Sequence, residues 1–301
     1  METTATVREV SKVVTAHKQR EGGGFIVRRP FPSLGLNLVD PFLLLDEMGP
    51  VEYAPGEAVG APDHPHRGFE TVTYMLAGEM QHEDSAGHRG FLRAGDVQWM
   101  TAGAGNVHSE EPSAPMRERG GRAHGFQIWV NLPARLKMTR PRYQEVAAAR
   151  IPTAATVDGH ARVRVIAGEA LGAKAVIDTH TPIVYQDWSV DAEADVTVPV
   201  ARDHQALVYV FEGAVRVGDA GDGRTVSDGQ LAILDAGDAV RLRGAPGGGR
   251  LLLLAGVPLA EPVARYGPFV MNTEQEIHDA VRDFQSGRMG EITRTAEVRE
   301  G

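Results

Sequence analysis

Apolar residues along this chain occur in short runs separated by Gly, Pro and Asp. The runs are rich in Val, Ile, Phe, Tyr and Trp, the residue types that fit a pleated, half-buried strand. Many short strands between turn residues are typical of an all-β barrel or sandwich. The clearest predicted strands are Phe25–Val27, Phe42–Leu45, Thr71–Leu76, Val97–Met100, Phe126–Val130, Val163–Ala167, Leu207–Phe211, Leu231–Leu234, Val240–Leu242 and Leu251–Leu254.

One segment near the C-terminus, MNTEQEIHDAVRDFQSGRMG, departs from this pattern. Thr273 is followed three residues later by Glu276, the spacing of a helical capping box. Apolar residues then recur at helical intervals, which predicts a helix that packs on the β structure. These apolar positions are Ile277, Ala280, Val281 and Phe284.

An internal repeat indicates that one unit occurs twice. The string YMLAGEM (Tyr74–Met80) resembles YVFEGAV (Tyr209–Val215), and LRAGDVQWM (Leu92–Met100) resembles VSDGQLAIL (Val226–Leu234). Strand, glycine turn, loop, glycine turn and strand therefore recur at nearly equal spacing. We predict two β-barrels with a few short helices.

The segment RPRYQEVAAARIPTAATVDG is the expected link between the two copies. We therefore predict two domains, residues 1–145 and residues 146–301. The second of these would end in the packing helix.

The candidate chemistry lies in the first copy. His64 and His66 are two residues apart at the start of an apolar run, and His108 and Glu110 are two apart after a glycine-rich turn. Side chains at such spacing on a strand point to the same face. Three imidazoles and a carboxylate suit a divalent first-row metal such as Fe, Ni, Cu or Mn, with positions left for water or substrate. A single histidine is more often a satisfied polar residue, but two such pairs in one barrel favour a metal site.

The second copy supports this interpretation because it lacks the ligands. The residues at the matching offsets from its glycine turns have no side chain that can ligate a metal. They are Pro199, Ala201, Leu242 and Gly244. The remaining histidines considered, His82, His88, His124 and His160, show no such pairing and are expected at the surface or in loops, with His82 a candidate for the mouth of the site.

The chain resembles the pirin family, a branch of the cupin superfamily. The strings that carry the resemblance are PFLLLDEMGPVEY, HPHRGFETVTYML, GDVQWMTAGAGNVHSEEP and GPFVMNTEQEIHDAVRDFQSGRMG, and it extends over nearly the whole chain. It implies a bicupin, two β-barrels with Fe in the N-terminal one. It also implies that the four metal ligands are His64, His66, His108 and Glu110.

The identity of the carboxylate ligand stays open at this point. The general cupin pattern, His-x-His followed by Glu after three or four residues, selects Glu70. The pirin pattern selects Glu110, which also pairs with His108 by spacing. Glu110 is therefore favoured, with Glu70 as a residue that orients a ligand or a water. Glu111 is expected to face solvent.

The roles of other residues close in sequence to the predicted metal ligands stay open. Gln98 and Met100 could line the pocket, whereas Phe69, Met80 and Trp99 could line it or belong to the core. Arg67 could attract an anionic substrate or pair with a carboxylate.

Composition and charge narrow the class of protein. The 301 residues are 42% apolar and 24% charged, as in a soluble globular protein, and the formal net charge of −9 argues against direct binding to nucleic acid. Without cysteine, disulfides, zinc thiolate sites and thiol nucleophiles are impossible. No secretory signal and no membrane-spanning run is visible, so a cytoplasmic, plausibly monomeric protein with no membrane partner is expected.

Two functions follow from the resemblance. In the first, the protein is a quercetin 2,3-dioxygenase-like enzyme that uses one divalent metal, most plausibly Fe(II), to open a flavonol or a related phenolic or enediol with dioxygen. Glu110 would be its general base. In the second, it is a metal-containing, redox-sensitive regulator that binds a transcription factor or a metabolic enzyme without turnover. Ni, Cu, Mn, Co or Zn could replace Fe in either case.

Overall fold

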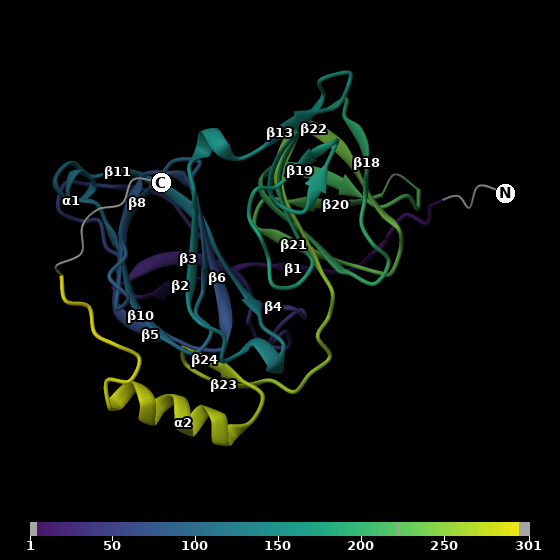
Figure 1. Ribbon diagram of the computed structural model, residues 1–301. Coiled ribbons are helices and arrows are strands. Elements are labelled where there is room, and N and C mark those ends of the chain that lie inside the picture. The colour runs from purple at the N-terminus through teal and green to yellow at the C-terminus, as the bar shows by residue number, and fades with distance from the viewer. Residues whose placement is uncertain (1–4, 222, 295–301) are drawn as a thin grey trace. The chain divides into compact units, whose positions relative to one another are not determined.

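The computed structural model describes residues 5–221 and 223–294. Strands dominate it, and the chain divides into two compact units, each a β-barrel (Figure 1). Among the described residues, the first barrel comprises His17–Leu38, Phe42–Ala148 and the part from Leu259 onward. The second barrel comprises the described part up to Ala16, together with Val39–Pro41 and Ala149–Pro258. The predicted all-β, two-barrel fold is confirmed.

The predicted division after residue 145 places the N-terminal segment in the first barrel and the C-terminal helix in the second. The structure shows the reverse for both elements. β1 (Val10–Thr15) pairs with β21 (Gln230–Leu234) in the second barrel. α2 (Glu274–Gln285) packs on the first barrel, where Ile277 and Ala280 join a cluster with Val107. Both assignments rest on contacts between residues far apart in the chain, which a local pattern does not reveal.

Two antiparallel sheets form the first barrel. The larger has the strand order β12-β9-β6-β11-β4-β3-β2, and the smaller has the order β5-β10-β7-β8. The larger sheet contains β2 (His17–Glu21), β3 (Phe25–Phe31), β4 (Phe42–Tyr53), β6 (Phe69–Ala77), β9 (Val97–Thr101), β11 (Gly121–Asn131) and β12 (Arg142–Val146). The smaller contains β5 (Ala61–His66), β7 (Glu79–Asp84), β8 (Arg89–Arg93) and β10 (Asn106–Pro112). Also in this unit are β23 (Ala264–Tyr266) paired with β24 (Phe269–Met271), α1 (Ala114–Arg119) and the 3₁₀ turn Ala134–Leu136.

The second barrel is one large antiparallel sheet with a dense apolar interior. Its main strand order is β1-β21-β19-β22-β17-β14-β13, with β18 on β22 and β20 on β19. Val208, Leu253 and Trp188 are fully buried in its core. Its further strands are β13 (Thr153–Ala155), β14 (Ala161–Ala167), β15 (Glu169–Ala170), β16 (Ala173–Lys174), β17 (Ile183–Val190), β18 (Asp195–Pro199), β19 (Gln205–Val217), β20 (Arg224–Ser227) and β22 (Ala239–Gly256), and the 3₁₀ turn Ala148–Arg150 precedes them.

The glycines of the internal repeat occupy equivalent backbone conformations. Gly78 and Gly95 have φ of 86° and 90°, and Gly213 and Gly229 have φ of 66° and 73°. Residues other than glycine rarely adopt such positive φ, because their Cβ would clash with the backbone. Gly95 and Gly229 lie just before β9 and β21, the strands that pair with β6 and β19. Gly78 lies between β6 and β7, whereas Gly213 lies within the longer β19, so the repeated motif marks a similar unit in both barrels.

The predicted capping box of α2 is present. The Thr273 hydroxyl accepts a hydrogen bond from the backbone N–H of Glu276, and the Glu276 carboxylate accepts one from the backbone N–H of Thr273. Phe284 remains 40% exposed but contacts the ring of Phe269. Within the described residues, no helix is long and apolar enough to cross a membrane.

A buried lysine fastens the C-terminal segment to the first barrel. Lys137 is 1% exposed, and its ammonium donates to Gly68 O at 2.8 Å, Asn131 Oδ1 at 2.7 Å and Val270 O at 3.0 Å. Burial lowers the pKa of Lys137 to about 8, so the group is still mostly protonated at pH 7. One ammonium thereby joins the start of β6, the end of β11 and β24.

Replacing this ammonium should destabilise the first barrel. Lys137→Met leaves three buried acceptors without a donor, and we expect a loss of about 3 kcal/mol in the free energy of unfolding. Urea denaturation measures this loss, with Lys18→Met, at an exposed lysine of β2, as the matched control. A loss equal to that of the control would contradict the role given to Lys137.

Candidate functional site

Three histidines meet where β5 pairs with β10. His64 stands opposite His108 in the ladder, and His66 stands opposite Asn106. The ring centroids of His64 and His66 are 4.7 Å apart, those of His64 and His108 are 4.4 Å apart, and those of His66 and His108 are 4.9 Å apart. One ring nitrogen from each residue lies within 4.8 Å of the other two, an arrangement that could hold a metal ion.

The protonation of these histidines favours metal binding. Burial, followed by the neighbouring histidines, lowers the pKa of both His66 and His108 well below the usual value. Neither ring nitrogen of His66 or His108 has a hydrogen-bond partner. In His64, Nδ1 lies 2.7 Å from Pro62 O, so it carries the proton and leaves Nε2 with its lone pair. Buried neutral imidazoles with no partner fit a metal site better than a satisfied core.

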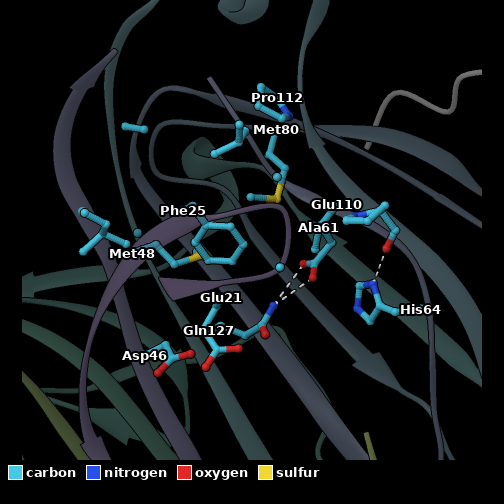
Figure 2. A pocket seen from close by; sticks show the side chains of 18 of the residues that line it. Glu21, Phe25, Asp46, Met48, Ala61, His64, Met80, Glu110, Pro112 and Gln127 are labelled. Atoms are coloured by element: carbon cyan, nitrogen blue, oxygen red, sulfur yellow. Dashed lines mark hydrogen bonds between the residues drawn. The ribbon is translucent and has the colours of Figure 1, made fainter. Parts of the chain in front are cut away.

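Glu110 lies beside the three histidines but is not among the groups whose ligand atoms lie within 4.8 Å of one another. The pairing shifts between His108 and Glu110 because β5 has one extra residue there, and Glu110 Oε2 is 3.8 Å from His108 Nε2. The carboxylate is buried and accepts a hydrogen bond from Thr73 Oγ1 at 2.9 Å. It also accepts from Gln127 Nε2 at 2.9 Å and 3.2 Å (Figure 2). These donors fix the carboxylate beside the imidazoles.

Glu70, the alternative carboxylate, is held elsewhere. It is fully buried, and its Oε1 accepts from Thr101 Oγ1 at 2.6 Å. It lies neither in the histidine group nor among the residues that line the adjoining cavity. The geometry thus favours Glu110 as the partner of the triad.

A cavity of about 500 Å³ opens next to His64, His66 and Glu110. Figure 2 shows Phe25, Met48 and Met80 around it, with the carboxylate of Glu110 facing inward. A mostly apolar wall with a few convergent polar groups is typical of a small-molecule site. Further apolar residues of the wall include Ile26, Leu44, Val51, Met75, Met116 and Trp129.

A charged cluster forms another part of this wall. Arg29 donates from Nε to Asp46 Oδ1 at 2.6 Å and from Nη2 to Asp46 Oδ2 at 2.5 Å, and its Nη1 lies 2.7 Å from Glu21 Oε1. Burial raises the pKa of Asp46 to about 6, against the effect of Arg29, so this carboxyl is ionised at neutral pH. Arg265 also lines the cavity and stacks on Trp129, with its Cζ 4.8 Å from the ring centroid.

Of the other residues considered for the pocket, one lines the cavity and the rest lie in the core or bind elsewhere. Met80 lines the cavity, whereas Phe69 lies behind it, with its ring centroid 4.4 Å from that of Trp129. Trp99 and Met100 are fully buried and do not line it. Gln98 instead donates to Glu145 Oε1 at 3.2 Å.

Arg67 and Glu111, the charged residues next to the predicted metal ligands, each form an ion pair. Arg67 Nη1 lies 2.9 Å from Asp283 Oδ2, and its Nε donates to Ala104 O. Arg67 therefore pairs with a carboxylate of α2, the second of its two interpretations. Glu111 is 39% exposed and pairs with Arg117, as expected for a residue that faces solvent.

Two of the histidines expected at the surface are buried. His82 is 1% exposed, with Nε2 at 2.9 Å from Glu145 Oε1, and it does not line the cavity. His124 is 8% exposed, lines the cavity and has Nε2 at 2.9 Å from Glu47 Oε1. The expectation was wrong because each is paired with a glutamate that is distant in sequence.

Gln127 and Trp129 were missed as site residues. They lie two apart on β11, and Trp129 Nε1 donates to Gln127 Oε1 at 3.4 Å. This contact sets the amide so that its NH₂ group faces Glu110. A polar residue on the same strand face as a tryptophan, within the run GFQIWV, was the available signal.

The second barrel offers no comparable group. Within the residues that the structure describes, the histidine triad is the one cluster of three or more ligand-type side chains that could hold a metal. Pro199 lies on β18 and Leu242 on β22, in regular pairing with their neighbours. The second copy of the scaffold thus occurs without these ligands.

Comparisons with known proteins agree with this architecture. Residues 24–130 match the Pirin family model, and residues 185–290 match the model of the pirin C-terminal cupin domain. A pirin-like protein of Solanum lycopersicum is 43% identical over 94% of this chain and 93% of its own length. Pirin of Homo sapiens is 41% identical over 94% of each chain.

Solved structures show the same relationship. A quercetin 2,3-dioxygenase from Acinetobacter baumannii is 41% identical and superposes with a TM-score of 0.88 over 96% of this chain and 100% of its own. A bacterial pirin from Escherichia coli, solved in complex with nickel(II), is 21% identical with a TM-score of 0.60 over 82% of this chain and 99% of its own, and it shares the fold. The chain belongs to the pirin family of cupin proteins.

Proposed function

We propose that this protein is a metal-dependent dioxygenase of the quercetinase type, acting on flavonol-like or related phenolic substrates. The observation that carries the proposal is the histidine triad with Glu110 at the wall of a largely apolar cavity. The likeness to a quercetin 2,3-dioxygenase at 41% identity supports it.

His64, His66, His108 and Glu110 are the residues that would hold the metal, with iron as the expected ion. The fit rests on the unpartnered nitrogens of buried His66 and His108 and on a mixed imidazole and carboxylate donor set. A bound divalent metal would act as a Lewis acid that acidifies the flavonol hydroxyl, and it would give dioxygen a place to react beside the substrate.

The proposed catalytic residue is Glu110. Its carboxylate faces the cavity and can accept the hydroxyl proton of a bound flavonol. Thr73 and Gln127 keep it in place through hydrogen bonds. The mostly apolar wall lowers the polarity around the reacting centre, which strengthens the electrostatic interactions within it.

The histidines are positioned by contacts that need no substrate. Pro62 O sets the tautomer of His64, and His66 lies edge-on to Phe69 and Trp129, with ring centroids 5.2 Å and 5.3 Å away. Such contacts orient ligands before a metal arrives.

Metal binding should depend on the triad. We expect wild-type protein, purified without oxygen, to hold about one divalent metal per chain, as the site has a single set of ligands. His66→Ala should weaken binding by more than the roughly 10- to 100-fold that loss of an outer partner costs. His278→Ala, at an exposed histidine of α2, is the matched control. Elemental analysis and titration of metal-free protein measure this, and unchanged binding by His66→Ala would exclude the site.

Oxygen consumption with quercetin tests the reaction. We expect metal-dependent uptake by the wild type and a decrease of about 100-fold or more for Glu110→Gln, because the general base is removed. His108→Ala should lose uptake together with its metal, and His278→Ala should retain it. Metal-loaded wild type that consumes no oxygen with flavonols would contradict the dioxygenase proposal and favour a metal-containing regulator that binds a protein partner.

Gln127 is proposed as a positioning residue for Glu110. Gln127→Leu should lower kcat about 10-fold, with little effect on KM. Gln275→Leu, on the exposed face of α2, is the control. A kcat equal to that of the control, or a loss that appears in KM instead of kcat, would contradict the positioning role.

A further inference from the structure

The cavity has two arginines in its wall, and they differ in what their guanidinium groups bind. Arg29 uses all three nitrogens on the carboxylates of Asp46 and Glu21. Both oxygens of Asp46 are occupied by Arg29, and Glu21 Oε1 also accepts from Gln19 at 2.6 Å. The charge of Arg29 is thus neutralised by two carboxylates, and three of its five N–H groups are already used.

Arg265 has donors to spare. Its Nη1 donates to Leu43 O at 3.3 Å, and among the described residues this is its one hydrogen bond. The rest of its binding is the stacking of the guanidinium on Trp129. The residue is exposed and lines the cavity, so its remaining N–H groups can be reached by a molecule bound there. A stacked arginine keeps its fork of donors pre-organised for a planar anionic acceptor such as a carboxylate.

The indole of Trp129 connects Arg265 with the proposed catalytic groups. One contact runs from Trp129 to His66, at 5.3 Å between ring centroids, and another runs from Trp129 Nε1 to Gln127, which holds Glu110. In Figure 2, Glu110 and His64 lie on one side of Gln127, and Asp46 and Glu21 lie on the other. Because His66 and Arg265 both contact the Trp129 ring, a flat ligand of two or three rings can reach from the triad to the guanidinium.

The charges of the metal site and of Arg265 together favour a ligand with an acidic group in addition to its ionised phenolic hydroxyl. A divalent metal with neutral histidines and the Glu110 carboxylate has a net charge of about +1, which one ionised phenolic hydroxyl neutralises. Arg265 then remains as a positive charge that forms no ion pair with a carboxylate of the described residues, although the nearby Asp46 and Glu21 favour its charged form. An additional anionic group on the ligand would find this charge at the edge of a low-dielectric cavity.

We propose that Arg265 is a specificity residue that selects planar aromatic ligands with a carboxylate on the ring remote from their metal-binding oxygens. The inference rests on the proposed function for the orientation of the ligand. It goes further in naming the acidic aromatic class of substrate and the residue that recognises it. Trp129 supports this residue by holding the guanidinium flat against its ring.

Binding of a matched pair of probes tests this. The probes are 3-hydroxyflavone and 4′-carboxy-3-hydroxyflavone, titrated without oxygen into the metal-loaded protein by calorimetry. We expect the wild type to bind the carboxylated probe about fivefold or more tightly than its parent. Arg265→Gln should bring this ratio to about one and change the affinity for 3-hydroxyflavone less than twofold. Arg265→Lys should keep part of the preference, because it retains the charge but not the fork.

Arg135→Gln, at an exposed arginine of the same barrel that does not line the cavity, is the control and should keep the wild-type ratio. A wild type without preference, or an Arg265→Gln variant that keeps it, would overturn the proposal, and failure of the wild type to bind either probe would overturn it as well. Oxygen uptake separates this outcome from failure of the proposed reaction: a preference that depends on Arg265, without turnover, supports the binding site and contradicts the dioxygenase.

Discussion

The register between β5 and β10 is the constraint on which the site depends. It sets His64 opposite His108, and the side-chain alternation of each strand then brings His66 and Glu110 to the same face. A shift of one residue between the two strands would turn one of the two pairs away from the cavity. β10 pairs regularly with β7 from His108 to Pro112, so His108 and Glu110 keep the two-residue spacing of a regular strand. The extra residue lies in β5, between Ala61 and His64.

This register buries imidazole nitrogens of the triad, which is unfavourable for folding unless a metal binds them. His66 and His108 are buried with unpartnered nitrogens, which is unfavourable in a protein interior unless something binds there. Nearby polar groups hold the carboxylates: Thr73 and Gln127 bind Glu110, and Thr101 binds Oε1 of Glu70. Hydrogen bonds around the triad thus orient its neighbours, as expected of a pre-organised metal-binding site.

Much of the fold and the centre of the site could be predicted from the sequence, because both follow local rules. Residues two apart on a strand share a face, so the pairing of His64 with His66 and of His108 with Glu110 needs no knowledge of tertiary structure. The capping box at Thr273 is equally local. The remainder depends on long-range contacts: the burial of His82 and His124 against Glu145 and Glu47, the barrel on which each chain end packs, and the approach of Arg265 to Trp129.

The most direct test of the account is to locate the metal. Crystals of protein purified without oxygen, measured on both sides of the absorption edge of the bound element, should show one anomalous peak per chain among the nitrogens of His64, His66 and His108, with Glu110 beside it. A metal bound elsewhere in the chain, or a folded protein that binds none, would contradict the account.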